Sequence, residues 1–215
     1  DKHHPGCKFR DMKDTYKSIT KASPEVLFKD RNSKFFGYAF PIKSEEEANQ
    51  HLEDLKSKHH KARHWCYAWQ LGKEEENYHY RANDDGEPSN SAGMPIYGQI
   101  QSFDVTNILI VVVRYFGIVK LGVGGLINAY KTAAQMALEA SDILKRTIDE
   151  IFMVKFDYPE MNKVMQVIKQ NNLNVIDQKL EIDCRIYISV RKKDVDQIYS
   201  KFDNTYKVEI TKLEN

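Results

Sequence analysis

The sequence predicts an α+β chain of two domains, and two observations support this fold class. All ten glycines lie at or before Gly125, so the last ninety residues contain none. Over those residues strand-type and helix-type hydrophobic spacing alternate regularly, whereas the earlier part mixes α/β elements with glycine-rich turns. We therefore predict one domain over residues 1–146 and a second over residues 147–215, joined by a linker at residues 144–147.

The second domain can be predicted element by element. β-branched and aromatic runs and strict alternation of apolar and polar residues indicate strands, while apolar residues spaced three and four apart indicate helices. Alternation is clearest from Leu180 to Val190. The predicted order is strand 150–156, helix from Pro159, strand 173–176, strand 180–190, helix 195–202 and strand 206–210. This β-α-β-β-α-β order is typical of a ferredoxin-like plait.

The first domain is also mixed but less regular. Ser44 followed by Glu47 is a capping box, which predicts a helix that runs to about Lys58 and ends in a solvated basic segment. Residues 107–116 are apolar on both faces, as expected of a central strand. The remaining predicted elements are strands over residues 36–42 and 65–71 and a helix from about Val123.

Composition narrows the class of protein. Lys and Arg number 32 against 31 Asp and Glu, so the chain lacks the basic field of a general nucleic-acid binder. The three cysteines are far apart, which argues against a disulfide framework and favours a reducing compartment. The longest aliphatic run has six residues, and Asp1–Pro5 lacks the apolar core of a signal peptide. We expect a soluble cytoplasmic protein without a membrane segment.

A glycine-rich segment between a buried strand and a helix is the most informative stretch. The candidate anion-binding or nucleic-acid-binding residues are Arg114, Gly117, Lys120, Gly122, Gly124 and Gly125. Free amides at a helix start favour an anion, and the two basic side chains would add charge-assisted hydrogen bonds. The spacing fits neither a P-loop nor a dinucleotide-binding motif. The alternative is that these glycines only allow helix and sheet to pack closely.

A second candidate is the acidic turn Asp84, Asp85 and Glu87. Three carboxylates within four residues would hold Mg²⁺ or move a proton. Equally, the same residues are ordinary turn formers, with Ser89 or Ser91 capping a short helix. His64 and Cys66 lie two residues apart and so share one side of a predicted strand. They would form part of a metal site or act as a nucleophile and its base. The simpler alternative is that Cys66 packs in the core. No metal site or cofactor is predicted.

Three motifs occur together in the first domain: HWCYA at residues 64–68, DDGEPS at 84–89 followed by AG at 92–93, and a third from Asn107 through RYFG at 114–117 to Tyr130. In order and spacing they resemble the YigZ/IMPACT family, over roughly residues 15–145. Two positions depart from the usual family pattern. Asn90-Ser91 stand where Gly-Thr is usual, and Ile118 stands where a second glycine is usual.

The resemblance implies a first domain like the second domain of a small-subunit ribosomal protein, as an α/β sandwich, and a second domain like a domain of elongation factor G. It also implies a role in translation, because eukaryotic relatives regulate translation by binding a ribosome-associated activator of an initiation-factor kinase.

Our leading hypothesis is therefore a non-enzymatic protein that contacts RNA or a ribosome-associated partner, as a translation or stress regulator. Neither domain is basic overall, since residues 151–215 hold 11 Lys and Arg against 10 Asp and Glu. The hypothesis thus requires Arg114 and Lys120 on one surface and the acidic turn elsewhere. The alternative is an enzyme acting on a phosphate-bearing small molecule, in which the acidic turn and the glycine loop share one pocket. A third possibility is a protein-interaction module that uses Arg185, Tyr187 and Ser189 on the exposed sheet face.

Overall fold

The fold was taken from a computed structural model, which describes residues 13–214. Cys7 and residues 1–5, which entered the expectations about cysteines and a leader, lie outside this range. The chain divides into two compact units. One spans Tyr16–Arg146, and the other combines the described residues up to Thr15 with residues 147–214.

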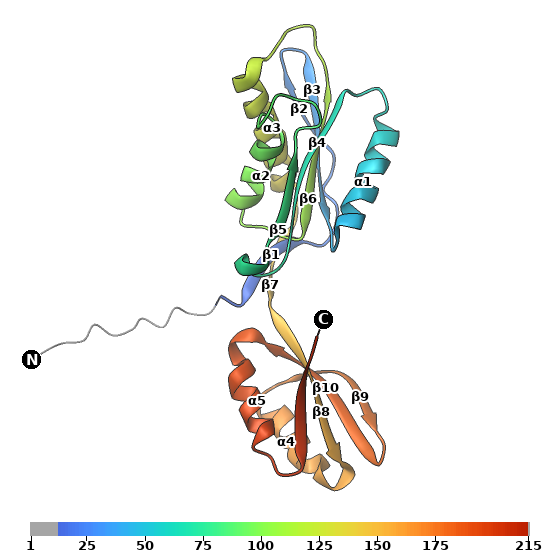
Figure 1. The fold of residues 1–215 in the computed structure, drawn as a ribbon, viewed down its shortest axis with the longest axis vertical. Coiled ribbons are helices and arrows are strands. Elements are labelled where there is room, and N and C mark those ends of the chain that lie inside the picture. Colours follow the sequence, from blue (N-terminus) through green and yellow to red (C-terminus); the bar gives the residue numbers. More distant parts are fainter. Residues whose placement is uncertain (1–12, 215) are drawn as a thin grey trace, which may run out of the picture. The chain divides into compact units, whose positions relative to one another are not determined.

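A five-stranded antiparallel sheet forms the centre of the larger unit (Figure 1). Its order is β2 (Val26–Asp30), β3 (Ser33–Pro41), β6 (Ile108–Tyr115), β4 (His64–Leu71) and β5 (His79–Asn83). Every residue of β6 from Ile108 to Arg114 is buried, so the predicted central strand is confirmed.

Helices cover both faces of this sheet (Figure 1). α1 (Glu45–Lys58) packs on one face, where Ser44 accepts the Glu47 amide at 3.2 Å as predicted from the capping box. α2 (Gly93–Ser102) and α3 (Gly122–Glu139) pack on the other face. A single turn of 3₁₀ helix, η1 (Glu75–Asn77), lies between β4 and β5.

The segment predicted as a linker is itself a strand. Residues 144–147 lie in β7 (Ile143–Thr147), which pairs with β1 (Thr15–Ile19) in a two-stranded sheet. Neither strand was predicted as one, because each is short and its hydrogen-bonding partner lies more than a hundred residues away along the chain.

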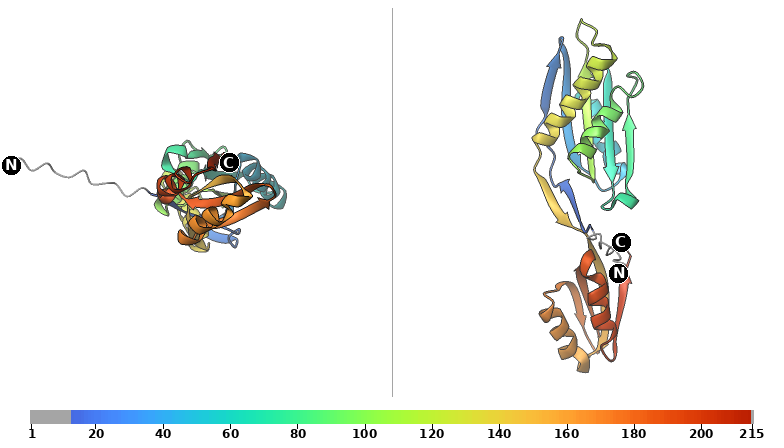
Figure 2. Two further views of the ribbon diagram at one scale, coloured as in Figure 1. Left: turned by 90° about the horizontal axis from the view of Figure 1, so that it is seen from below. Right: turned by 90° about the vertical axis from the view of Figure 1, so that its left-hand side faces the viewer.

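The smaller unit has the predicted order of elements. Its strands β8 (Asp149–Asp157), β9 (Asn174–Leu180), β10 (Asp183–Arg191) and β11 (Val208–Leu213) form an antiparallel sheet in the order β11-β8-β10-β9. The helices α4 (Met161–Gln170) and α5 (Val195–Asp203) follow the short 3₁₀ turns η2 (Tyr158–Glu160) and η3 (Lys192–Asp194). Both helices contribute to one apolar core with the sheet. Figure 2 shows the helices and strands of this unit in two further views.

The turn between β9 and β10 is the clearest difference from the prediction in this unit. The alternation that began at Leu180 was taken as one strand, but Leu180 ends β9 and Ile182 lies exposed in the turn before β10. A period of two continues unbroken through a tight hairpin connection, so spacing alone did not show the turn.

The residues just before Tyr16 belong to the smaller unit. The Asp14 carbonyl accepts the Ile148 amide at 2.7 Å, and the Asp14 carboxylate binds the Arg191 guanidinium. This unit is therefore assembled from two separate stretches of sequence, whereas the sequence placed everything up to residue 146 in the first domain. Across residues 13–214, no helix is both long and apolar enough to cross a membrane.

Candidate functional site

Three neighbouring strands of the larger unit place Phe35, Arg114 and His64 side by side. Arg114 on β6 is in register with Phe35 on β3 and with His64 on β4. Because side chains alternate along a strand, Arg114 projects to the same face as Val112, which lies in the core beneath α2 and α3. The guanidinium of Arg114 and the imidazole of His64 therefore lie on the sheet face that α2 and α3 cover.

Glu87, from the acidic turn, binds both of these groups. One Arg114 guanidinium nitrogen donates to the two Glu87 oxygens at 2.8 and 2.7 Å. The Tyr130 hydroxyl of α3 donates to Glu87 Oε2 at 2.6 Å, and His64 Nε2 lies 3.2 Å from Oε1. The side chain of Glu87 is only 4% exposed. We call these four residues, together with Cys66, the Glu87 cluster.

Aromatic rings enclose the guanidinium of the cluster. The Arg114 Cζ atom lies 4.3 Å from the ring centroid of Phe116 and 5.6 Å from that of Phe35. Phe35 in turn meets Tyr130 edge to face, with ring centroids 5.2 Å apart. Cation–π contacts and a paired carboxylate are what a buried guanidinium needs to offset its lost hydration.

The requirement that Arg114 and the acidic turn lie on separate surfaces is therefore wrong. Arg114 is 7% exposed and paired with Glu87, so it does not present its charge to solvent beside Lys120. The physical reason is its place on the central strand, where an unpaired charge would be costly. The signal available in the sequence was the strand itself, since Arg114 directly follows six aliphatic residues in a strand that is apolar on both faces.

The other two carboxylates of the turn serve the backbone. Asp84 accepts hydrogen bonds from the amides of Asn90, Ala92 and Gly93, at 2.9, 3.1 and 2.8 Å, and thereby caps the start of α2. Asp85 accepts the Trp65 amide at 2.8 Å. The three carboxylates point to three different sets of donors and do not act as one acid–base or metal-binding set. Nor do the His, Cys, Asp and Glu side chains of residues 13–214 form any other group suited to a metal ion.

The predicted caps Ser89 and Ser91 do not cap α2. Ser91 donates its hydroxyl proton to the Pro88 carbonyl, and no side chain of the residue directly preceding the helix bonds to its amides. Asp84 takes this role from eight and nine residues away, a distance at which a local capping pattern cannot be recognised.

Cys66 is a core residue of the cluster rather than half of a nucleophile–base pair. Its thiol is buried and lies 3.1 Å from the Asp84 carbonyl oxygen, to which it donates. Burial raises the pKa of this thiol, and burial also raises the pKa of Tyr130, beside Cys66 and Glu87. Both groups therefore remain protonated near neutral pH. This agrees with the simpler of the two interpretations of Cys66.

The glycines of the loop have different roles. A Cβ at Gly117 would lie 2.4 Å from the Asn32 carbonyl carbon, and the Gly117 amide donates to Ser33 Oγ at 3.0 Å. Gly117 thus allows close packing against the β2–β3 turn. Gly122 has a φ of +70°, a value that favours glycine at the start of α3. A Cβ at Gly125 would lie 3.2 Å from that of Leu121, whereas one at Gly124 would meet nothing within 4 Å.

The surface around the start of α3 is largely apolar. No side chain caps the first amides of the helix, whose N-cap is Leu121. Ile118 is 96% exposed, and Lys120 beside it is also exposed. The other exposed apolar side chains of this surface are Phe116, Val119 and Val123. We call residues 116–123 the α3 loop.

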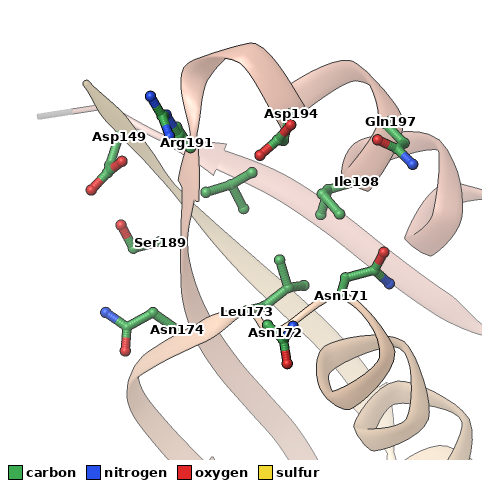
Figure 3. A pocket seen from close by; sticks show the side chains of 11 residues that line it. Asp149, Asn171, Asn172, Leu173, Asn174, Ser189, Arg191, Asp194, Gln197 and Ile198 are labelled. Carbon is green, nitrogen blue, oxygen red and sulfur yellow. The ribbon is translucent and has the colours of Figure 1, made fainter. Parts of the chain in front are cut away.

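A cavity in the smaller unit is lined mainly by polar groups, in contrast to the apolar α3 loop (Figure 3). It measures about 380 Å³ and lies between the end of α4 and the start of α5. Carboxamides and the carboxylates of Asp149 and Asp194 surround it, and its one guanidinium, from Arg191, is already bound to Asp14. It presents neither free cations nor aromatic rings for a nucleic acid.

The residues of the possible protein-interaction face lie on β10 of the same sheet. Arg185, Tyr187 and Ser189 are half-buried there.

Comparison with known proteins identifies the family. The model of the Impact N-terminal domain matches residues 31–138, half of the chain, and this range contains the whole Glu87 cluster. The chain belongs to the IMPACT family. The motifs at residues 64–68, 84–93 and 107–130 lie far apart along the sequence, and each contributes a residue at the carboxylate of Glu87.

Bacterial relatives match over most of their length. An IMPACT family member of Haemophilus influenzae is 28% identical over 82% of this chain and 86% of the relative. IMPACT family member YvyE of Bacillus subtilis is 30% identical over 74% and 72%. A crystal structure of a hypothetical protein is 21% identical with a TM-score of 0.64, covering 95% of this chain and all of that chain, which supports the fold.

Proposed function

We propose that this IMPACT family protein is a non-enzymatic regulator of translation that binds a ribosome-associated protein through the α3 loop. The observation that carries the proposal is the composition of that loop. Ile118, Phe116 and Val119 are exposed next to the uncapped amides of α3. Two cations lie beside them: Lys120, and Arg31, whose guanidinium donates to the Lys120 carbonyl at 3.4 Å. Apolar side chains around a few polar donors are typical of a protein-binding surface.

The buried position of Arg114 favours a protein partner over RNA. Binding to a nucleic-acid backbone depends on several Lys and Arg side chains that displace counterions. With Arg114 paired to Glu87, Lys120 is the one predicted basic residue of the pair that faces solvent. The Glu87 cluster then has a supporting role: it fixes the strand end and helix from which the loop projects.

The role in translation rests on family membership. Regulation of translation through a ribosome-associated activator is what the resemblance to eukaryotic relatives implies, and a cytoplasmic location follows from the same partner. The enzymatic alternative has no specific support, because Asp84 and Asp85 are engaged with backbone amides and Glu87 with three side chains.

Cosedimentation with ribosomes from cell lysate tests the proposal. We expect the full chain to sediment with ribosomal fractions, Ile118→Ser to weaken this about tenfold or more, and Ile182→Ser to have no effect. Ile182 is a matched control because it is an isoleucine of similar exposure in the other unit. Apolar contacts persist at high salt, whereas contacts to RNA phosphates weaken by ~10³ or more between 50 and 200 mM salt.

The possible outcomes separate the alternatives. No cosedimentation at any salt concentration, or equal losses in the two variants, would contradict the proposal. Binding that disappears between 50 and 200 mM salt, and that Ile118→Ser leaves unchanged at low salt, would assign the protein to RNA instead.

A further inference from the structure

A second cavity, in the larger unit, lies outside the Glu87 cluster and the α3 loop. Its volume is about 630 Å³, within the range of roughly 300–1,000 Å³ typical of small-molecule sites. Segments far apart in sequence line it: β1, the end of β3, the residues after β4, Asn107 and the end of β7. None of the candidate residues considered above contributes to it.

Three cations line this cavity without an ion-pair partner. Lys43, Lys73 and Arg146 come from three different segments, and none of them pairs with a carboxylate within the part of the chain that the structure describes. Glu47 is the lining carboxylate, and it already accepts the Lys43 backbone amide at 2.8 Å as part of the cap of α1. The cavity therefore has three positive groups against one negative group.

Neutral hydrogen-bond donors lie deeper in the cavity. Ser18 is 7% exposed, and both contacts of its hydroxyl, with the carbonyl oxygens of Ile19 and Asn107, are at the 3.5 Å limit of a hydrogen bond. Asn107 accepts the Gly72 amide through its side-chain oxygen at 2.9 Å, which leaves the NH₂ group of the same side chain to donate. A weakly bonded hydroxyl and an available amide thus face a cavity whose rim is cationic.

The aromatic ring of Tyr16 completes the lining. Lys73 Nζ lies 5.7 Å from the centroid of this ring. That contact leaves the three N–H donors of Lys73 available, since a cation–π contact uses the charge rather than the hydrogen bonds.

We propose that this cavity binds a small molecule carrying two or more phosphate groups, of the nucleoside diphosphate class. Lys and Arg side chains with hydroxyl and amide donors are the groups that recognise phosphate oxygens. Three cations on separate segments match a ligand with several anionic groups, and the volume exceeds what a single phosphate fills. The proposal does not depend on the function proposed above, because no residue is shared between the two sites.

Isothermal titration calorimetry of the full chain tests it, with pyrophosphate, ADP, adenosine and a short single-stranded RNA as separate titrants. We expect pyrophosphate and ADP to bind and adenosine not to bind. The double substitution Lys73→Gln/Arg146→Gln weakens binding at least about tenfold. Lys131→Gln leaves it unchanged, since Lys131 is an exposed lysine on α3 that does not line the cavity. A thermal melt of each variant verifies folding, and Lys43→Gln replaces the double variant if that one is unfolded.

Three results would overturn the proposal: no binding of pyrophosphate or ADP, binding that the cavity substitutions leave unchanged, or binding of RNA alone. Failure of this experiment leaves ribosome cosedimentation through the α3 loop unaffected, so the two ideas are tested separately.

Discussion

One guanidinium nitrogen of Arg114 donates to both carboxylate oxygens of Glu87, 27 residues earlier in the chain. The contact joins the central strand of the larger unit to the acidic turn, and Tyr130 joins α3 to the same carboxylate. A charged pair in this position stabilises the fold only while both partners are present, because either one alone is a buried, unpaired charge.

Replacing Glu87 with Gln is therefore expected to lower the free energy of unfolding of the larger unit by about 3–5 kcal/mol. Urea unfolding followed by tryptophan fluorescence measures this unit specifically, because both tryptophans, Trp65 and Trp69, lie on β4. As a control, Asp142→Asn removes an exposed ion pair with Lys21 and should cost less than about 1 kcal/mol. Similar losses in the two variants would show that the Glu87 pair contributes little.

Replacing Asp84 should destabilise the larger unit more than replacing Ser91, one of the two serines predicted to cap α2. Asp84→Ala removes the acceptor of three backbone amides and is expected to cost about 2 kcal/mol, the upper end of the range for a helix cap. Ser91→Ala removes one hydrogen bond to a carbonyl and should cost about 1 kcal/mol or less. The same urea titrations compare the losses of unfolding free energy in the two variants. A larger loss for Ser91→Ala would show that Ser91, and not Asp84, caps α2.

Two glycines of the α3 loop region should respond in opposite directions to alanine. Gly117→Ala places a Cβ against the backbone of Asn32 and Ser33 and is expected to cost ~1–3 kcal/mol. Gly124→Ala meets nothing within 4 Å in a helical position and is expected to stabilise by up to about 1 kcal/mol. Unfolding free energies of the two variants and the wild type, measured at one pH, test both expectations. Destabilisation by both substitutions would mean that position 124 does not tolerate a side chain either.

His59 should make the larger unit less stable in mild acid. Sequence spacing placed it in a solvated helix end, but it is 7% exposed, with Nε2 against the Tyr38 hydroxyl and Nδ1 against the Tyr115 hydroxyl. Burial lowers the pKa of His59, Glu25 opposes that shift, and Lys58 adds to it. The folded imidazole is thus neutral where the unfolded one, with a pKa near 6.5, already takes up a proton. Falling pH therefore favours the unfolded chain below about pH 6.5.

Urea unfolding of wild type at pH 7.5 and 5.5 should show this loss, and His59→Gln should show less of it. His60→Gln is the matched control, because His60 is exposed next to it in sequence. Glu25 also has a lowered pKa, since hydrogen bonds from Tyr38 and Lys58 outweigh its burial, but its contribution is lost only at lower pH, below about 4.5. If His60→Gln and His59→Gln have equal pH dependence, the assignment to His59 is wrong.

Asp14→Asn should loosen the smaller unit. The hydrogen bond from Arg191 holds the pKa of Asp14 below its usual value against the opposing effect of burial. The ionised form thus stabilises the fold above about pH 3.8, and this contribution is lost as the pH falls through the lowered pKa. Hydrogen exchange at the amides of Ile148 and Lys192 should become faster in the variant, while exchange in β6 stays unchanged. Unaltered exchange at both amides would place Asp14 outside this unit's cooperative structure.

Elements with a strong local signal were predictable from sequence. β6 begins with a run of six aliphatic residues, α1 begins with a capping box, and the smaller unit alternates between two clear periods. These patterns arise from the chain's own geometry, in which one face of each element must be apolar, so no distant residue is needed to recognise them.

The arrangement of the candidate site depended on partners that only the folded chain brings together. Sequence alone singled out Arg114, Lys120 and the acidic turn as chemically important, and all of them lie within residues 31–138, which the family model matches. Only the tertiary structure decided that Arg114 faces inward to Glu87 while Lys120 faces solvent, because a charge on a central strand takes whichever partner the fold supplies. The same holds for the cap of α2 by Asp84 and for the pairing of β1 with β7: long-range contacts decide them, and hydrophobic periodicity carries no record of which distant residues will meet.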